Sequence, residues 1–155
     1  MSETRKAPKK MAAMKELLED PQVQSWRAIM GAFQSVLAEL EKGLMSDGLH
    51  VSRFQIQFYL YFEPPLSAAE IARRLLVTRG NISTFLKRLE KDKQIVVCPS
   101  SPSMQRPLYR LSSDAERQFE KVFPDHIKRV KKLVPALPKN VVQSLQKLGK
   151  SDSES

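Results

Sequence analysis

Residues 67–110 have the sequence SAAEIARRLLVTRGNISTFLKRLEKDKQIVVCPSSPSMQRPLYR, and this stretch decides the fold. Ser67 and Glu70 have the spacing of a capping box, which starts a helix, and Thr78 is placed to cap a second helix after a short turn. Two runs with the composition of β-strands follow. The pattern predicts a helix-turn-helix and then a β-hairpin, with helices over 68–75 and 79–92 and strands over 95–98 and 107–111.

The second helix of this motif has two different faces. Ile82, Phe85, Leu86 and Leu89 recur at helical spacing and form an apolar stripe, whereas the opposite face is polar and basic. Residues 73–110 carry nine lysines and arginines against two acids, which gives a net charge of +7 in a chain whose total is +9. Because the helix does not need this charge to fold, the charge indicates a surface that binds phosphate groups.

A helix-turn-helix places its second helix in the major groove of DNA, and a β-hairpin directly after it makes the motif a winged helix. We therefore expect DNA contacts from the polar face of the second helix, from the starts of both helices and from the hairpin loop. The candidate residues are Ser67, Thr78, Arg79, Gly80, Asn81, Ser83, Thr84, Lys87, Arg88, Gln105 and Arg106.

The segments that flank the motif are also predicted to be helical. Asp20 followed by Pro21 has the form of a helix start, and apolar residues then recur for about six turns. Gly43 and Gly48 are expected to end this long helix. Shorter helices are predicted over 11–19 and 52–62.

Two helices are predicted after the hairpin. Ser112 and Ser113 can cap a helix that runs to Phe123, where Pro124 is expected to kink or break it. Pro138 is expected to start the last helix, whose apolar residues lie between Val141 and Leu148.

The overall composition is that of a mainly helical globular protein. The chain has 155 residues, of which 41% are apolar and only five are glycine. It contains no apolar run near the roughly 18 residues that span a bilayer, and no secretory signal, so we expect no membrane association. A single cysteine, Cys98, excludes an internal disulfide framework and favours a reducing cytoplasm.

The apolar faces of the terminal helices are larger than the small winged lobe can cover. We therefore expect a homodimer built by the N- and C-terminal helices. The expected organisation is a flexible basic arm (1–10), N-terminal dimerisation helices (11–50), a winged helix-turn-helix lobe (51–112), C-terminal dimerisation helices (113–148) and a disordered tail (149–155).

The stretches LSAAEIARRLLVTRGNISTFLKRLEKDKQIV and PLYRLSSDAERQFEKVFPDHIKRV resemble the MarR family of bacterial winged-helix transcription regulators. The resemblance implies a homodimer whose terminal helices form the interface, and many such proteins are repressors that small ligands or oxidation release from DNA. It matches residues 79–91 to the recognition helix and residues 99–106 to the wing.

Two positions depart from the family pattern. The turn between the two helices usually has glycine, whereas this chain has Leu76, and a non-glycine residue in a left-handed conformation costs about 1 kcal/mol. The wing often carries an Asp-Arg pair, whereas this chain has Gln105 and Arg106. The arginine that would enter the minor groove is therefore present without the acid that would brace it.

Other candidate sites are weaker. Cys98 is interpreted as a packed side chain rather than a redox sensor, and His50 and His126 lack the spacing of a zinc site, so we expect no metal or cofactor. The sequence also lacks the constellations of catalytic residues that would indicate an enzyme. The large side chains that are candidates to line a pocket for a small apolar or aromatic ligand are Trp26, Met30, Phe33, Phe54 and Phe58.

These observations favour a homodimeric, sequence-specific regulator of transcription, expected to be a ligand-responsive repressor that binds a pseudo-palindromic site on double-stranded DNA in the cytoplasm. The alternative is a winged-helix module that binds another protein and no specific DNA. The charge of the motif favours the first interpretation, because a protein-binding version would not need it.

Overall fold

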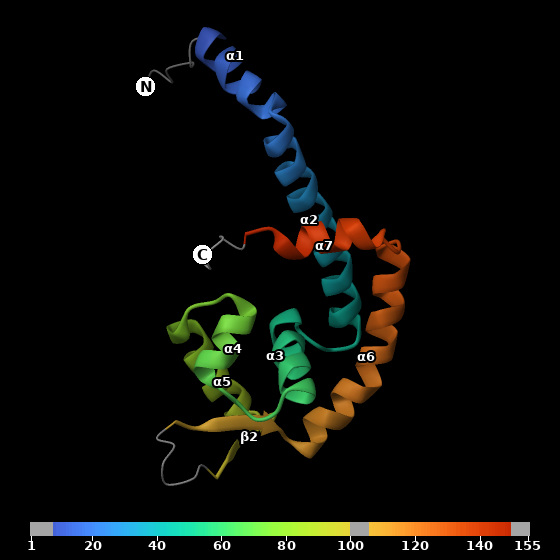
Figure 1. The fold of residues 1–155 in the computed structure, drawn as a ribbon. Helices are drawn as coiled ribbons and strands as arrows, with labels where there is room; N and C mark the ends of the chain where they lie inside the picture. Colours follow the sequence, from blue (N-terminus) through green and yellow to red (C-terminus); the bar gives the residue numbers. More distant parts are fainter. Residues whose placement is uncertain (1–7, 100–105, 150–155) are drawn as a thin grey trace, which may run out of the picture.

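The computed structural model describes residues 8–99 and 106–149 (Figure 1). The predicted flexible arm (1–10) therefore lies outside the described residues up to residue 7, and residues 8–10 are already helical. The elements are α1 (Pro8–Glu16), the 3-10 helix η1 (Leu17–Glu19), α2 (Pro21–Ser46), α3 (Val51–Phe62), β1 (Leu66–Ser67), α4 (Ala68–Leu75), α5 (Arg79–Lys91), β2 (Ile95–Cys98), β3 (Leu108–Leu111), α6 (Ser113–Leu133) and α7 (Lys139–Lys147).

The elements form a winged lobe and a set of long helices that lead away from it (Figure 1). The helices α3, α4 and α5 and the strands make up the lobe, while α6 runs back from the lobe beside α2. The N-terminal helix α1 lies at the far end of α2, and α7 crosses α2 near its middle in this view. The predicted fold class, mainly helical with a small β wing, is confirmed.

The wing belongs to a three-stranded antiparallel sheet with the order β1-β3-β2, one strand more than the sequence predicted. Tyr109 in the middle strand pairs with Leu66 of β1 on one side and with Val97 of β2 on the other. A two-residue strand is too short to show the alternation by which strands are recognised, which is why β1 was missed. The pairing fixes the start of α4 directly to the wing.

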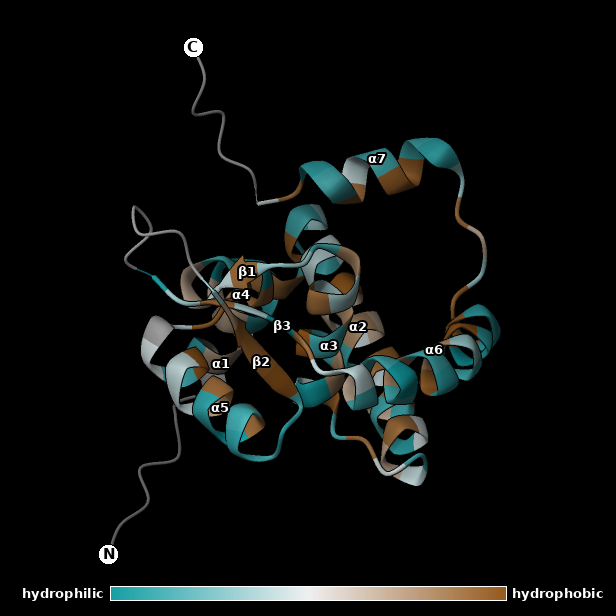
Figure 2. Cartoon of the chain, turned by 90° about the horizontal axis from the view of Figure 1, so that it is seen from below, coloured by the Kyte–Doolittle hydropathy of each residue, from teal (hydrophilic) through white to brown (hydrophobic). Residues whose placement is uncertain are grey.

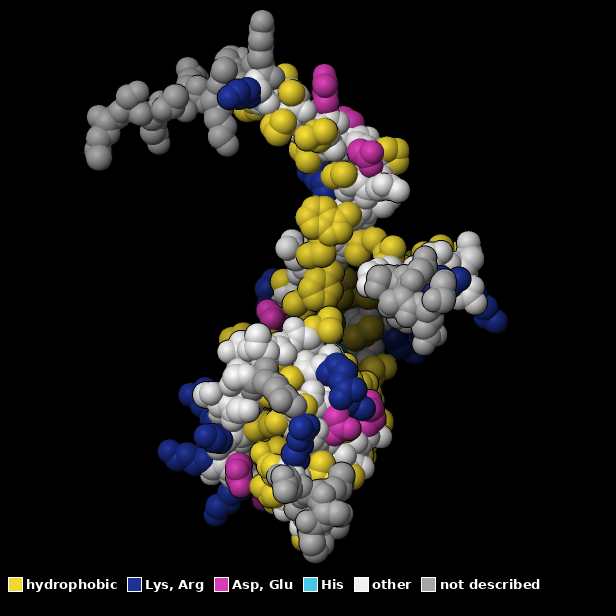
Figure 3. Space-filling view, turned by 60° about the vertical axis from the view of Figure 1, so that its left-hand side comes forward, with side chains coloured by type: hydrophobic (Ala, Val, Ile, Leu, Met, Phe, Trp, Pro, Cys, Tyr) yellow, Lys and Arg dark blue, Asp and Glu magenta, His cyan; other side chains and the backbone are white. Residues whose placement is uncertain are grey.

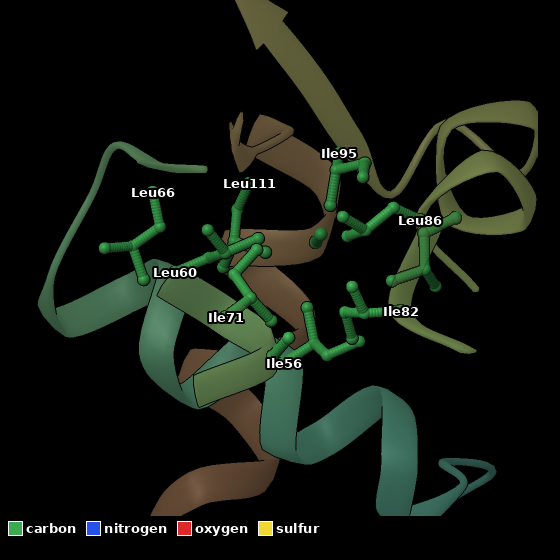
Figure 4. Close-up of a cluster of buried hydrophobic side chains, with 11 residues drawn as sticks. Ile56, Leu60, Leu66, Ile71, Ile82, Leu86, Ile95 and Leu111 are labelled. Atoms are coloured by element: carbon green, nitrogen blue, oxygen red, sulfur yellow. The ribbon is translucent and has the colours of Figure 1, made fainter. Parts of the chain in front are cut away.

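Eleven buried side chains form the core of the lobe (Figure 4). They come from α3, α4, α5, α6 and the sheet, and Ile71 of α4 and Ala115 of α6 are fully buried. Ile82, Leu86 and Leu89 are buried in this core, and Phe85 packs against it, which confirms the predicted apolar stripe of α5. The opposite face of the same helix is consequently turned to solvent.

The turn between α4 and α5 keeps a left-handed residue although it has no glycine. Leu76 has φ 54° and ψ 40°, and the amide of Val77 donates to the carbonyl of Ala72 at 3.1 Å, which closes the end of α4. Leu76 is 92% exposed, so its side chain contributes almost no packing to offset the backbone strain. The turn geometry is therefore retained at the expense of local stability.

Replacing Leu76 by glycine is expected to raise the free energy of unfolding by about 0.5–1 kcal/mol, because relief of the left-handed strain outweighs the added chain entropy of glycine. Chemical denaturation monitored by circular dichroism measures the change. The control is Val77→Gly, next to the strained position and without a positive φ, which should destabilise the chain. A Leu76→Gly variant less stable than the wild type would contradict this account.

Two features of the long helices differ from the sequence prediction. Gly43 does not end α2, which continues to Ser46. A Cβ at Gly43 would lie 2.6 Å from the Cδ of Arg129, so a larger residue there would displace the side chain of Arg129 from its present position. Arg129 forms a two-pronged ion pair with Asp47, with an Nη1–Oδ2 distance of 2.6 Å, and this pair joins the end of α2 to α6.

Pro124 does not break α6, which is helical from Ser113 to Leu133 and visibly curved (Figure 1). Pro124 is exposed, so its ring lies at the helix surface. Proline has no N–H to donate, and the missing backbone hydrogen bond is therefore also on the exposed side of the helix. The neighbouring residues hold the helix in place, since Phe119 and Val122 are buried against α2 and α3. Packing of the turn before Pro124 thus keeps the helix continuous, so of the two expected outcomes, a kink or a break, the break does not occur.

Candidate nucleic-acid interface

The solvent-facing side of α5 carries the side chains predicted to contact DNA. Ser83, Thr84, Lys87 and Arg88 are all exposed, and the structure records no salt bridge between either cation and the described residues. The hydroxyl of Thr84 donates to the carbonyl of Gly80 at 3.3 Å, which leaves the oxygen available as an acceptor. This face can therefore offer donors, acceptors and positive charge to one partner.

The first turn of α5 is accessible at its backbone. Thr78 caps the helix as predicted, because its hydroxyl accepts the amide of Asn81 at 3.4 Å. A Cβ at Gly80 would meet no atom within 4 Å, so no neighbour in the described structure requires glycine at this position. The missing side chain instead leaves room for close approach of another molecule to the backbone.

The start of α4 is fixed by the predicted capping box. The amide and hydroxyl of Ser67 both donate to Glu70 Oε2 at 2.8 Å, and the amide of Glu70 donates back to the hydroxyl of Ser67 at 3.3 Å. The hydrogen bond from the Ser67 amide lowers the pKa of Glu70, as do the Ser67 hydroxyl and the nearby cations Arg74 and Arg73. An ionised Glu70 therefore holds Ser67 in one orientation.

A hollow of about 270 Å³ brings together three elements that are distant in the sequence. Ser67 contributes from the start of α4, Ser83 from α5, and Arg106 from the end of the wing loop. A second hollow, of about 550 Å³, is lined by Asn81, Thr84, Phe85 and Arg88 on the other side of α5. The predicted residues thus line two hollows along a single helix. Figure 2 shows the ribbon from below, with α5 beside the strands of the wing.

Two of the predicted contacts fall outside what the structure describes. Gln105 lies in the wing segment 100–105, and the side chain of Arg79 is likewise beyond the described part. The expectation that Arg106 lacks a bracing acid therefore stays a prediction.

The structure adds two residues that are not among the predicted DNA contacts. His50 and Arg53, at the start of α3, line a hollow of about 610 Å³ with Arg88. Arg53 is held there by Asp92, with an Nη2–Oδ2 distance of 3.1 Å. The only sequence signal was their position beside the turn at Gly48, and nothing in it indicated that α3 starts next to the end of α5.

The five side chains predicted to line a ligand pocket lie in different surroundings. Trp26, Met30 and Phe33 are exposed on α2. Phe54 is buried, with its ring 4.4 Å from that of His126 and 5.6 Å from that of Phe119. Phe58 lies at the surface of the lobe and contacts Phe62 and Phe123. Among the described residues, no ring–ring contact joins Trp26, Phe33, Phe54 or Phe58 to another of these four.

Other chemistry-bearing groups take structural positions. Cys98 is half-buried in β2. His126 packs between helices, and burial and the nearby Arg129 lower its pKa. Among residues 8–99 and 106–149, no group of three His, Cys, Asp or Glu side chains is placed to hold a metal ion. In the same residues, no helix is both long enough and apolar enough to cross a membrane.

Comparison with known families identifies what this arrangement resembles. Residues 47–103 match the model of the MarR family. The HTH-type transcriptional regulator YkoM of Bacillus subtilis is 26% identical over 106 residues, which cover 68% of each chain.

Solved structures share the fold at lower identity. AbsC, a MarR family transcriptional regulator of Streptomyces coelicolor, superposes with a TM-score of 0.73 at 19% identity, over 84% of this chain and 90% of AbsC. Sco3205, a MarR family transcriptional regulator from the same organism, was solved in complex with DNA. It superposes with a TM-score of 0.72 at 22% identity, over 87% of this chain and 92% of Sco3205. The DNA binding of BpsR of Bordetella bronchiseptica is regulated by 6-hydroxynicotinic acid. BpsR superposes with a TM-score of 0.70 at 16% identity, over 87% of this chain and 96% of BpsR.

Proposed function

Because the chain belongs to the MarR family of winged-helix transcription regulators, we propose that it is a repressor that binds a specific, pseudo-palindromic DNA site as a homodimer. The proposal places α5 in the major groove and the wing in the adjacent minor groove. Such a protein acts where the chromosome is, in the cytoplasm. Its activity is recognition rather than catalysis.

The observation that carries the proposal is the alignment of three kinds of donor along one surface. The outer face of α5 offers Ser83 and Thr84 for base edges and Lys87 and Arg88 for phosphates or bases. Arg106 stands at the rim of the same hollow as Ser83, where a cation can reach a neighbouring groove. Gly80 lets the helix backbone approach the duplex closely.

The homodimer is supported by apolar surface that this chain leaves uncovered. On α2, Trp26 is 62% exposed and Phe33 is 58% exposed. Val141, Val142 and Leu145 of α7 are also exposed, although they recur on one helical face. Monomeric proteins rarely present so many large apolar side chains to water, and a second copy offers the same kind of surface in return.

The proposal includes a response to a small aromatic ligand. The DNA binding of BpsR, a protein with the same fold, is regulated by such a molecule, 6-hydroxynicotinic acid. The exposed rings of Trp26, Phe33 and Phe58 supply aromatic surface for such a molecule. A ligand held between α2 and the lobe would alter how the two lobes of a dimer are spaced, and spacing decides whether both recognition helices fit one site.

Capture of fragments from the genome of the source organism by the purified protein tests the proposal. The expected result is enrichment of a short inverted repeat, with a footprint symmetrical about its centre. Binding to all fragments alike, with no enriched sequence at any salt concentration, would contradict specific recognition. It would favour the alternative of a protein-binding winged helix.

Arg106→Ala is expected to weaken binding to the enriched site by about five- to tenfold, because one cation is removed from the minor groove. The footprint should shorten at the outer flanks of each half-site, where the wings would lie. Arg117→Ala removes an exposed arginine from α6 and serves as the control, since its ion pair is with Asp114 on the same helix. Unchanged affinity and footprint for Arg106→Ala would leave α5 as the only element that contacts bases.

A further inference from the structure

The place where the long helices join the lobe has a core of its own. The helices α2, α3 and α6 contact one another there, and a second cluster of buried side chains lies between them. Its members are Leu44, Leu49, Phe54, Phe119 and Val122. Hydrophobic side chains are also visible at the surface where the long helices meet the lobe (Figure 3). We call this region the junction, because it sets the orientation of the lobe relative to α2 and α6.

His126 of α6 is half-buried at the junction and suits only one protonation state. Its ring centroid lies 4.4 Å from that of Phe54 on α3. Its Nδ1 atom is buried and has no hydrogen-bond partner among the described residues. A neutral ring that carries its proton on Nε2 leaves Nδ1 without a donor to satisfy. Protonation would instead place an N–H at Nδ1 that lacks an acceptor in this packing.

Two charged groups act on this ring in opposite directions. Burial lowers the pKa of His126, and the guanidinium of Arg129, one turn further along α6, lowers it again. The carboxylate of Asp47, at the end of α2, favours the charged form. From α3 the ring meets an uncharged phenyl group, and Asp125 of α6 is paired with Lys128. A movement of Asp47 toward the ring would therefore stabilise the imidazolium.

The carboxylate of Asp47 already has a partner in Arg129. The guanidinium donates to it at two points, with Nη1–Oδ2 and Nη2–Oδ1 distances of 2.6 and 3.2 Å. The two side chains are 28% and 26% exposed, so solvent screens this ion pair less than the pairs on open helix surfaces. The pair joins α2 to α6 where His126 packs α6 against α3. A proton on His126 would compete with Arg129 for the carboxylate that holds the junction closed.

We propose that His126 is a proton switch: protonation of Nδ1 attracts Asp47 away from Arg129 and loosens the junction, which weakens DNA binding. The proton comes from the solvent, and no covalent bond other than N–H is formed. In the proposed homodimer both lobes must fit one site, so a change of lobe orientation in each copy alters the spacing of the two recognition helices. The switch rests on the proposed function, because it names acid as a regulator of that DNA binding.

Acid should also destabilise the folded chain through this residue. Because the pKa of His126 is lowered in the native state, the unfolded chain binds the proton more tightly. The free energy of unfolding should therefore fall as the pH drops below about 6.5, and the contribution should be complete well above that pH. His126→Phe keeps a ring beside Phe54 and cannot titrate, so this part of the pH dependence should disappear. Urea denaturation over a series of pH values measures it.

The main test compares DNA affinity at about pH 7.5 and about pH 5.5, at constant ionic strength, on the fragment enriched by genomic capture. The wild type should bind about three- to tenfold more weakly at the lower pH. His126→Phe should bind within about twofold of the same affinity at both values. Fluorescence anisotropy with labelled fragments gives the Kd. Equal acid weakening of His126→Phe and the wild type would overturn the switch.

The matched control is His50→Gln, because the chain has two histidines and this variant removes the other one. His50 lies beside Arg88 in the candidate interface, so its replacement can change the affinity itself. The ratio of the two Kd values should nevertheless stay that of the wild type. Loss of the acid response in His50→Gln alone would assign the response to the interface and contradict a switch at the junction.

Asp47→Asn tests whether the switch acts through the ion pair. It removes the carboxylate charge that both Arg129 and the imidazolium need. At about pH 7.5 it should therefore weaken binding as much as acid weakens the wild type, and acid should add less than about twofold. Wild-type affinity together with a wild-type acid response in this variant would overturn the role given to the pair.

Proton NMR titration tests the protonation step without DNA. The ring signal that His126→Phe lacks belongs to His126, and its midpoint should lie below about 6.5, the ordinary value of a histidine ring. Arg129→Gln should raise this midpoint, because a repelling charge is removed and Asp47 is released toward the ring. A midpoint that Arg129→Gln leaves unchanged would contradict the proposed competition for Asp47.

The switch and the proposed function can fail separately. A chain that enriches no DNA sequence would contradict the proposed function, and the NMR and unfolding measurements would still decide whether His126 takes up the proton. A specific site that the wild type binds equally well at both pH values would overturn only the switch. Circular dichroism shows whether each variant is folded. If His126→Phe is not folded, His126→Gln replaces it with the same expected results.

Discussion

Replacing Lys87 and Arg88 together by alanine should weaken DNA binding by about 50- to 100-fold near 0.1 M salt. Both side chains lie on the exposed face of α5, one turn beyond Ser83 and Thr84. Each cation that neutralises a phosphate releases condensed counterions, and removing two such contacts per copy should make the slope of log K against log salt shallower by about 2 for each half-site. Titration over a range of salt concentrations measures both quantities.

The loss should be nearly the same on the specific site and on random DNA if the two residues contact phosphates only. A loss confined to the specific site would mean that one of them binds a base edge, with Arg88 the better candidate because a guanidinium can bind guanine at two points. Arg117→Ala/Lys121→Ala removes two cations from α6 and should leave the affinity near that of the wild type. Equal weakening by both pairs would assign the effect to net charge alone.

Leu86→Ala should lower the free energy of unfolding by about 3 kcal/mol, the largest stability change we expect from a single substitution. Leu86 is 1% exposed and belongs to the core that holds α5 to the lobe, where it lies near Ile82 and Ile95 (Figure 4). Truncation removes buried methyl groups and leaves a cavity that the sheet and two other helices cannot collapse to fill. Urea denaturation monitored by circular dichroism gives the difference.

The matched control is Met45→Ala, which truncates a side chain that is 69% exposed on α2 and should change stability by less than about 0.5 kcal/mol. DNA binding by Leu86→Ala should fall in proportion to the unfolded fraction and recover at low temperature, where the lobe is folded. A fully stable Leu86→Ala variant would contradict the described packing of α5.

The sequence predicted the helix-turn-helix well because several local signals agreed there. Ser67, Glu70 and Thr78 occupy the caps for which their side chains are suited, and Ile82, Leu86 and Leu89 recur with the period of a helix. Each signal is local, so none depends on knowing the neighbouring elements. The strained position in the turn, Leu76, was expected from the resemblance to a family that usually has glycine there, and its left-handed backbone confirms it.

The remaining features depend on contacts between distant segments. Gly43 looked like the end of a helix, but its real constraint is the side chain of Arg129, which is far away in the sequence. Pro124 stays inside a helix whose preceding turn is held by the buried Phe119 and Val122. The positions of His50 and Arg53 beside Arg88 are likewise set by how α3 meets α5. Periodicity and turn chemistry carry no information about such pairings.

The middle strand β3 pairs with β1 on one edge and with β2 on the other. The capped start of α4 and the two long strands of the wing are therefore bonded into one sheet, and α5 is packed beneath it. On a duplex, the distance between a major-groove contact and its minor-groove neighbour is consequently fixed by the lobe itself. Operators with altered spacing inside a half-site should be rejected, whereas altered spacing between half-sites tests only how far the long helices can bend.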